Sequence, residues 1–497
     1  MSNTKNRFLC ASIAALLAAL LTLSAIASVT QFFLKYFIKL GAVGWVSLIV
    51  YVGAFAILVF FCAQPRTAAC ERKLAGWIIG LTFLLKLVLV VTWSHLPQRS
   101  DGLYLLQFID RWAIGGDEIL RQMSHEIYDW PLWASRAWPF LYPLRILFPT
   151  HFVFATQLFN CLLSTALLAA IYSLTHRLVT RPLLPLAFAA VSPVFYWSVL
   201  SYGYRCQGVL LLLAALALIR FFLCGSKPAR WRTLLMSVLL GLILFLLHLQ
   251  QGLDLVVIAL LLFTLAYAAW QQHYARHFFR LVLLTLVLPT AIMLPLSRAT
   301  DNWFAKRNEG KLYGGFIFQM AVGWNLVTWG ELYWPVAELD IRTPPEQKTK
   351  VMLDYIQQQI REHPFNAIVR LPFVKVIKLF QLGAANATEI TFEEMGHAGW
   401  AAIFKASRLV FTPIVLLLAA IGSRRFLNSG EPERMMWILL ILDFTAAYTF
   451  FCEVSPNYSI FFQFVLLACA AEGVAILCDF FTTARQRVIQ PTPLTQS

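Results

Sequence analysis

The stretch HLPQRSDGLYLLQFIDRWAIGG, residues His95–Gly116, brings the first dense group of charges in a very apolar chain. Ser100 and Asp101 suit the start of a helix, where a side-chain oxygen accepts from backbone N–H groups and the helix dipole favours an anion. Gly115 and Gly116 predict the end of that helix. The stretch therefore predicts a short helix directly after a membrane segment.

The expected helix over residues 100–114 is amphipathic. Spacings of three and four residues place polar side chains on one face and apolar side chains opposite or beside them. The polar set is Gln107, Asp110 and Arg111, and the apolar set is Phe108, Ile109 and Trp112. A helix of this kind is expected to lie in the plane of the membrane interface, which would hold Asp101 at the depth of the lipid headgroups.

The composition around this stretch is that of a membrane protein. Of the 497 residues, 59% are hydrophobic and 13% are charged, whereas a soluble protein carries about 25% charged residues. The mean hydropathy of +0.69 predicts many membrane spans and no separate soluble domain. The net charge of +15 is expected to report membrane topology, so we predict no nucleic-acid partner. The nine cysteines show no metal-ligand spacing and are expected to be small buried side chains.

Twelve apolar segments are long enough to cross a bilayer, and each satisfies its backbone hydrogen bonds there only as a helix. They cover residues 8–28, 43–63, 75–95, 150–174, 183–200, 205–223, 233–249, 253–271, 280–297, 404–422, 435–452 and 457–479. The sequence therefore predicts an all-α integral membrane protein of about 12 transmembrane helices, with interfacial juxtamembrane helices and two long outer-face loops. The first segment, which begins at Phe8, is expected to be a retained helix rather than a signal peptide.

We expect a single polytopic transmembrane domain, residues 1–480, and a cytoplasmic tail, residues 481–497. The parts of the domain are an N-terminal helix hairpin (1–74), a core (75–297) that includes the first outer loop (96–149), a large outer-face loop (298–403) and C-terminal helices (404–480).

Every second short connection between the predicted spans is rich in lysine and arginine. Examples are Lys227, Arg230 and Arg232 in one connection, and Arg424, Arg425 and Arg434 in another. The positive-inside rule places these connections, and with them both termini, in the cytoplasm. The two long segments, 96–149 and 298–403, then lie on the outer side, where we expect the chemistry.

Two charges fall well inside predicted spans. Lys86 and Asp443 each lie about ten residues from the outer end of a helix, so they share a similar depth. We therefore predict a buried ion pair between them, and the alternative is two separate side chains that are solvated or locally hydrogen-bonded.

Four segments occur in an order and at a spacing typical of one enzyme family. They are SDGLYLLQFIDRWAIGG (100–116), RAWPFLYPLRILFPTHFVFATQLFNCLLSTALLAAIYSLTHRLV (136–179), VSPVFYWSVLSYGYRCQGVLLLLAALAL (191–218) and DYIQQQIREHPFNAIVRLPFVKVIKLFQ (354–381). Over about residues 75–480 the chain resembles the GT-C superfamily of multi-pass glycosyltransferases. It is similar in particular to bacterial relatives of protein mannosyltransferases and of the aminoarabinose transferase of lipid A.

The resemblance implies an enzyme of the bacterial inner membrane whose active site faces the periplasm. Family members take a sugar from a polyprenyl-phosphate carrier and pass it to an acceptor, here expected to be a glycan or a glycolipid. An acid of the first long loop serves as the base, which points to Asp101. A carboxylate within hydrogen-bond reach takes the proton of the acceptor hydroxyl as the new bond forms. The alternative is that Asp101 only caps a helix beside Ser100.

The chain departs from the family pattern in two places. Gly102 stands where relatives usually carry a second acid, so paired acids are not implied here. Residues 1–70 add a hairpin, because many relatives have only one helix before the acidic motif. No cofactor is implied with certainty, and acids near Asp101, among them Asp117 and Glu118, leave a divalent metal open.

The resemblance also implies cations for the leaving lipid phosphate, whose developing negative charge fixed cations stabilise. The candidates are Arg205, Arg136 and His248. Arg205 stands where many relatives carry an acid, and its guanidinium suits a phosphate. Arg136 falls near a basic position of relatives, and His248 falls near a polar or basic cluster. The alternatives are surface arginines and a structural histidine.

Four further residues are expected to contact the substrate, namely Tyr142, Lys311, Glu453 and Tyr458. Tyr142 lies in the Pro/Tyr-rich segment before a span. Lys311 lies in a glycine- and aromatic-rich part of the large loop, and its alternative is an exposed solvated base. Glu453 and Tyr458 flank an outer helix junction, where Asn457 replaces the arginine usual in relatives.

Two rival functions remain open at the level of sequence. An O-antigen polymerase or ligase also has many spans and a large outer loop, but usually relies on Arg and His of that loop. A transporter or flippase performs no covalent chemistry and usually has several intramembrane charges. A change of Asp101 to asparagine separates these functions from a transferase that uses Asp101 as its base.

Overall fold

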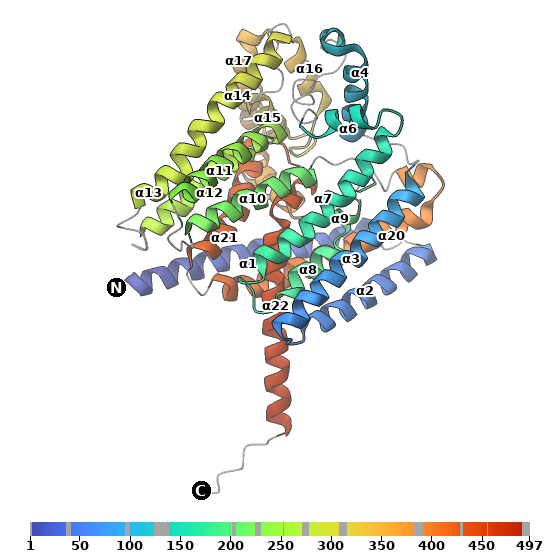
Figure 1. Cartoon of the computed structure of the whole chain (residues 1–497), viewed down its shortest axis with the longest axis vertical. Helices are drawn as coiled ribbons and strands as arrows, with labels where there is room; N and C mark the ends of the chain where they lie inside the picture. Colours follow the sequence, from blue (N-terminus) through green and yellow to red (C-terminus); the bar gives the residue numbers. More distant parts are fainter. Residues whose placement is uncertain are drawn as a thin grey trace.

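The computed structural model describes residues 2–35, 41–94, 100–123, 139–197, 199–200, 205–223, 230–251, 253–270, 278–307, 316–381, 391–427, 431–454 and 456–489. Every regular element in these ranges is a helix (Figure 1). Eleven helices among them are long and apolar enough to cross a membrane. The predicted fold class, an all-α multi-pass membrane protein, is confirmed.

The candidate spans agree with eleven of the twelve predicted segments. They are α1 (Ser2–Lys35), α2 (Gly41–Ala63), α3 (Ala68–Trp93), α7 (Phe152–Thr175), α10 (Arg205–Leu223), α11 (Arg230–Gln251), α12 (Leu253–Trp270), the run of α13 (Phe278–Val282), η2 (Leu283–Val287) and α14 (Leu288–Arg307), α20 (Ala398–Leu427), α21 (Pro432–Ala446) with η4 (Ala447–Phe451), and α22 (Ile460–Ile489).

The twelfth predicted segment, 183–200, is not one continuous helix. It divides into α8 (Leu183–Val191) and α9 (Pro193–Trp197), and Ser192 between them is extended with ψ of 122°. Proline has no backbone N–H and pushes the preceding residue out of the helical region. Pro193 therefore breaks the helix at Ser192.

The α8–α9 pair still returns the chain across the bundle. Arg220, in the last turn of α10, donates to the carbonyl oxygen of Leu174, in the last turn of α7, at 3.1 Å. Its guanidinium also pairs with Glu433 at the start of α21, at 3.0 Å. Since α7 and α10 end at the same face, the segment between them must run back to the opposite face.

The centre of the bundle is α22. Every residue from Ile460 to Ala475 is buried, as expected of a helix that is apolar all round. The closest packing is with α20, where two glycines oppose each other. A Cβ on Gly422 would lie 1.9 Å from the carbonyl oxygen of Cys469, and a Cβ on Gly473 would lie 2.0 Å from that of Leu418. The helices α1 and α2 pack against the other side of α20.

The helices of the two long segments between the spans gather at one end of the molecule. They are α4 (Ser100–Met123), α6 (Leu141–Leu147), α15 (Phe316–Gly323), α16 (Trp334–Arg342), α17 (Pro345–Glu362), η3 (Asn366–Arg370) and α18 (Leu371–Leu379). Figure 1 shows α4, α6 and α15–α17 at the top, whereas the end of α22 projects from the bottom. They belong to the two long segments that we expect to lie outside, so we refer to this end as the outer face.

Two lysines of α18 tie this outer assembly to the spans. The ammonium of Lys375 is buried and donates to the carbonyl oxygens of Gly323 and Cys452, at 3.1 and 2.7 Å. Lys378 donates to the carbonyl oxygen of Thr328 at 2.8 Å and pairs with Glu331 at 2.9 Å. The α15–α16 connection and the turn after η4 are therefore held by one short helix.

The predicted ion pair between Lys86 and Asp443 is wrong. Lys86 is fully buried in α3 and donates to the hydroxyl of Ser164 in α7, at 3.0 Å. Within the described residues, Oδ2 of Asp443 is buried with no hydrogen-bond partner. The two helices lie in different parts of the bundle, because α3 packs mainly on α7 and α8 and α21 packs mainly on α12.

Candidate active site at the outer face

The helix α4 is longer than predicted. It continues through Gly115 to Met123 and is kinked at Gly116, which takes a positive φ of 58° with ψ of −148°. Glycine adopts this backbone conformation without a steric penalty. The glycines therefore bend the helix instead of ending it, because a second helical stretch follows directly.

The apolar face of α4 packs on protein. Phe108 and Ile109 are fully buried, and Trp112 is buried as well, whereas Gln107 and Arg111 are exposed. The predicted division into two faces is confirmed. The expected position in the plane of the lipid interface is modified, because α6 and α14 cover the apolar face.

Two aromatic contacts and one ion pair fix α4. The Trp112 ring lies 4.8 Å from the Tyr142 ring of α6 and 6.4 Å from the Trp303 ring of α14, between ring centroids. Arg145 of α6 binds Asp110 at 2.6 Å. Tyr142, predicted to contact the substrate, therefore lies against the helix that carries Asp101.

Several predicted site residues fall wholly or partly outside the description. The backbone of Asp101 lies in the first turn of α4, as predicted, but its side chain lies outside the described residues. Arg136 and Lys311 lie in ranges that the structure does not describe.

Arg205 and Tyr458, predicted separately, meet at the outer end of the bundle. Arg205 is the first residue of α10, and its guanidinium carbon lies 5.5 Å from the centroid of the Tyr458 ring. Tyr458 stacks on Tyr448 of η4 with centroids 4.6 Å apart, and Tyr448 stacks on Phe444 at 6.0 Å. Stacked rings hold the tyrosine in place and offer its face to a cation. A guanidinium is chemically suited to bind a phosphate.

His248 lies between two carboxylates. Its Nδ1 is 3.3 Å from Oδ2 of Asp254, the second residue of α12, and its Nε2 is 3.6 Å from Oδ2 of Asp301 in α14. The Asp254 side chain is 3% exposed and that of Asp301 is 53% exposed,. Because each ring nitrogen faces a carboxylate, the geometry favours a clamp across three helices over a direct contact with a phosphate.

Glu453 lies near the buried lysine of α18. Burial lowers the pKa of Lys375 from 10.5 to about 7, and the nearby charges of Cys452 and Glu453 oppose that shift. Burial also raises the pKa of the Cys452 thiol to about 11. Glu453 therefore takes part in the electrostatics of the turn that α18 holds.

The structure gives no support for a metal ion within the residues it describes. No group of three or more His, Cys, Asp or Glu side chains lies close enough there to hold one. The acids that left a metal open include Asp101 and Asp117, whose side chains are outside the description.

The sequence did not single out Asp254, Asp301, Trp303 or Lys375. Asp254 follows His248 by only six residues, and this short separation is the one sequence signal for their contact. Asp301 and Trp303 approach only through the packing of α14 on α11 and α4. Lys375 lies in a helix of the large predicted loop, and nothing in the sequence indicates that its side chain is buried.

Comparisons with known proteins add little. No protein-family model and no curated protein sequence matches the chain. Among solved structures, the chain is similar to the archaeal oligosaccharyltransferase AglB from Archaeoglobus fulgidus, in complex with an inhibitory peptide and a dolichol-phosphate. The sequence identity is 12% and the TM-score is 0.45, over 86% of this chain and 53% of that chain. The present chain thus spans about half the length of AglB, and this likeness carries no argument about activity.

Proposed function

We propose that this protein is a glycosyltransferase of the bacterial inner membrane. It would move a sugar from a polyprenyl-phosphate carrier to a glycan or glycolipid acceptor at the outer face. The observation that carries the proposal is the anchoring of α4, the helix that begins with Ser100 and Asp101, on α6 and α14, at the end of the bundle that we expect to lie outside. The order of the four sequence motifs supports the same reaction.

In the proposed reaction, Asp101 takes the proton of the acceptor hydroxyl as the acceptor oxygen bonds to the anomeric carbon. The bond between that carbon and the carrier phosphate breaks, and polyprenyl phosphate leaves with the electron pair. Arg205 stabilises the negative charge of the leaving phosphate. Tyr458 supports this role, because its stacked ring positions the guanidinium at the end of α10.

The first test measures surface glycans by mass spectrometry in a strain that lacks the protein and in strains that carry variants. Wild type and the matched control Asp354→Asn, an exposed acid of α17, should restore the missing glycan. Asp101→Asn should restore less than about 1% of it at equal protein level, since loss of a general base costs 100-fold or more. Full restoration by Asp101→Asn would rule out the base, and identical glycans with and without the protein would rule out the transferase.

A transporter or flippase is the second candidate, and the buried polar side chains of the spans favour it. Lys86 is fully buried with no carboxylate partner in the described residues, and neither amide atom of Asn160, one turn before Ser164, has a hydrogen-bond partner there. Intramembrane ionisable residues often mark transport pathways. In the same strains, loss of the glycan with Lys86→Met together with full restoration by Asp101→Asn would favour this candidate.

A further inference from the structure

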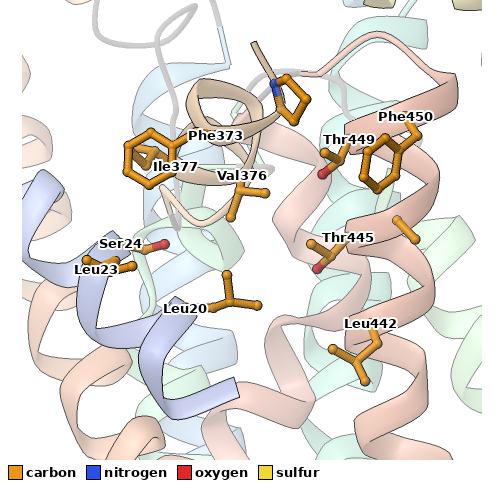
Figure 2. A pocket seen from close by; sticks show the side chains of 12 residues that line it. Leu20, Leu23, Ser24, Phe373, Val376, Ile377, Leu442, Thr445, Thr449 and Phe450 are labelled. Carbon is orange, nitrogen blue, oxygen red and sulfur yellow. The ribbon is translucent and has the colours of Figure 1, made fainter. Parts of the chain in front are cut away.

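An apolar pocket lies between α1, α18 and the α21–η4 run. Its volume is about 390 Å³, within the usual range for a ligand site. Figure 2 shows Leu20 of α1, Val376 of α18 and Thr445 of α21 facing one space. The wall is hydrocarbon almost throughout. Leu20, Leu23, Ser24, Pro372, Phe373, Val376, Ile377, Leu442, Thr445, Ala446, Thr449 and Phe450 line it.

The pocket opens outward at a rim of large apolar side chains. Leu23, Phe373 and Phe450 are 48%, 52% and 49% exposed, whereas Ser24 and Thr449 at its floor are 1% and 6% exposed. The α1 and α21–η4 parts of the wall belong to candidate membrane spans. The surroundings of the rim are therefore the bilayer, and the molecules that reach it are lipids.

The segment that leads to the rim is an amphipathic helix of the outer face. Phe365, Ile368, Val369 and Phe373 are all more than half exposed and recur at helical spacing along η3 and α18. The opposite face, with Ala367, Leu371 and Lys375, is buried in protein. An exposed apolar stripe on such a helix inserts into the membrane interface. The rim therefore lies just below the headgroups of the outer leaflet.

Hydrocarbon alone gives the pocket no selectivity, because the lipid around it is as apolar as its wall. Selection must come from the headgroup. Arg370 directly precedes α18, is exposed, and holds its guanidinium 4.8 Å from the Trp329 ring centroid. It has no carboxylate partner in the described part of the chain, in contrast to Lys378, which pairs with Glu331. This exposed cation beside the rim therefore fits an anionic headgroup.

We propose that this pocket binds one acyl chain of an anionic phospholipid of the outer leaflet, with the lipid phosphate at Arg370. The site is independent of the proposed transferase reaction. It also depends on α1, which belongs to the added N-terminal hairpin. A lipid held there would brace η4 from the side of Thr449 and Phe450, whereas Tyr448 of the same turn stacks under Tyr458.

The test is native mass spectrometry of the full chain in detergent with added phosphatidylglycerol or phosphatidylcholine of identical acyl chains. Wild type should retain phosphatidylglycerol about fivefold better, since one cation near the headgroup contributes about 1 kcal/mol. Arg370→Gln should remove this preference. The matched control Arg298→Gln, an exposed cation of α14, should keep it.

Filling the pocket provides the second arm. Val376→Trp should release both lipids, whereas Leu85→Trp, on the exposed side of α3, should release neither. Because Val376→Trp alters a packed position, its elution profile and melting temperature are measured in parallel, and Arg370→Gln tests the site without touching the packing. Three outcomes overturn the proposal: equal retention of both lipids by wild type, unchanged retention by a folded Val376→Trp variant, or displacement of phosphatidylglycerol by polyprenyl phosphate, which would assign the pocket to the carrier.

Discussion

Lys375 shows how a single side chain holds the outer assembly together. Its amine bridges the carbonyl oxygens of Gly323 and Cys452, which lie far apart in the sequence. The space around it is tight, because a Cβ added to Gly323 would lie 2.4 Å from the Cys452 carbonyl oxygen. A buried cation without a paired anion is costly, so the protonation state of Lys375 bears on stability.

The pKa of Lys375 predicts a pH dependence of stability. It falls from 10.5 to about 7 on folding. Between these two values the unfolded chain binds more protons than the folded chain, so stability should increase with pH from about 7 to about 10.5 and level off below 7. The melting temperature in detergent, measured from pH 6 to 9.5, should rise in wild type. In Lys375→Met this part of the rise should be missing, and an identical rise in both proteins would contradict the prediction.

The residue scale also shows the limits of sequence. Arg205 and Tyr458 were each predicted as site residues, but their contact joins positions about 250 apart and depends on how α10 meets the short turn Pro456–Ser459 before α22. His248 was predicted to bind the donor phosphate, with a structural histidine as the alternative. The packing of α12 and α14 brings Asp254 and Asp301 to its two ring nitrogens, and the sequence did not single out either acid. The sequence pattern predicts which residues are candidates for the site. Their contact partners come from distant helices and follow only from the packing.

At the scale of elements, hydropathy predicts which segments are helices, and local backbone chemistry decides where they break. The run 183–200 is apolar enough to cross the membrane as one helix, but Pro193 divides it. Gly116 has the opposite effect, because a predicted end becomes a kink in α4. The amphipathic pattern of α4 fixed which face is buried, and the neighbouring helices decided that this face meets protein.

The crossing of α20 and α22 gives a prediction at this scale. Gly422→Ala places a methyl group 1.9 Å from the Cys469 carbonyl oxygen, so the two helices must separate. Forced separation of well-packed helices costs about 1–3 kcal/mol. We therefore expect a lower melting temperature in detergent and faster proteolysis at the ends of α20. The matched control is Gly53→Ala in α2, where a Cβ meets nothing within 4 Å and which should not lower stability. Equal melting temperatures of the two variants would contradict the close crossing.

At the scale of the whole molecule, ion pairs and hydrogen bonds near the helix ends indicate which ends share a face. Glu472 of α22 accepts from the hydroxyl of Thr180, just after α7, at 3.0 Å and pairs with Arg425 of α20 at 3.0 Å. Together with Arg220, these contacts gather the ends of α7, α10 and α20 on one side. Arg424 and Arg425 lie on this side, so we predict from the positive-inside rule that it is the cytoplasmic one.

Cysteine labelling at α17 and at the end of α20 tests this topology, because we predict that these two sites lie on opposite sides of the membrane. A cysteine at exposed Asp354 should react with a membrane-impermeant maleimide in intact spheroplasts, and a cysteine at exposed Arg424 should react only after permeabilisation. The background is Cys70→Ala, because Cys70 is exposed. Cys452, on the outer side, should react slowly, since its pKa is raised to about 11 and the thiolate is the reactive form. If the α8–α9 pair did not cross the membrane, every later helix would have the opposite orientation. The cysteine at position 424 would then react in intact spheroplasts, and the cysteine at position 354 would react only after permeabilisation.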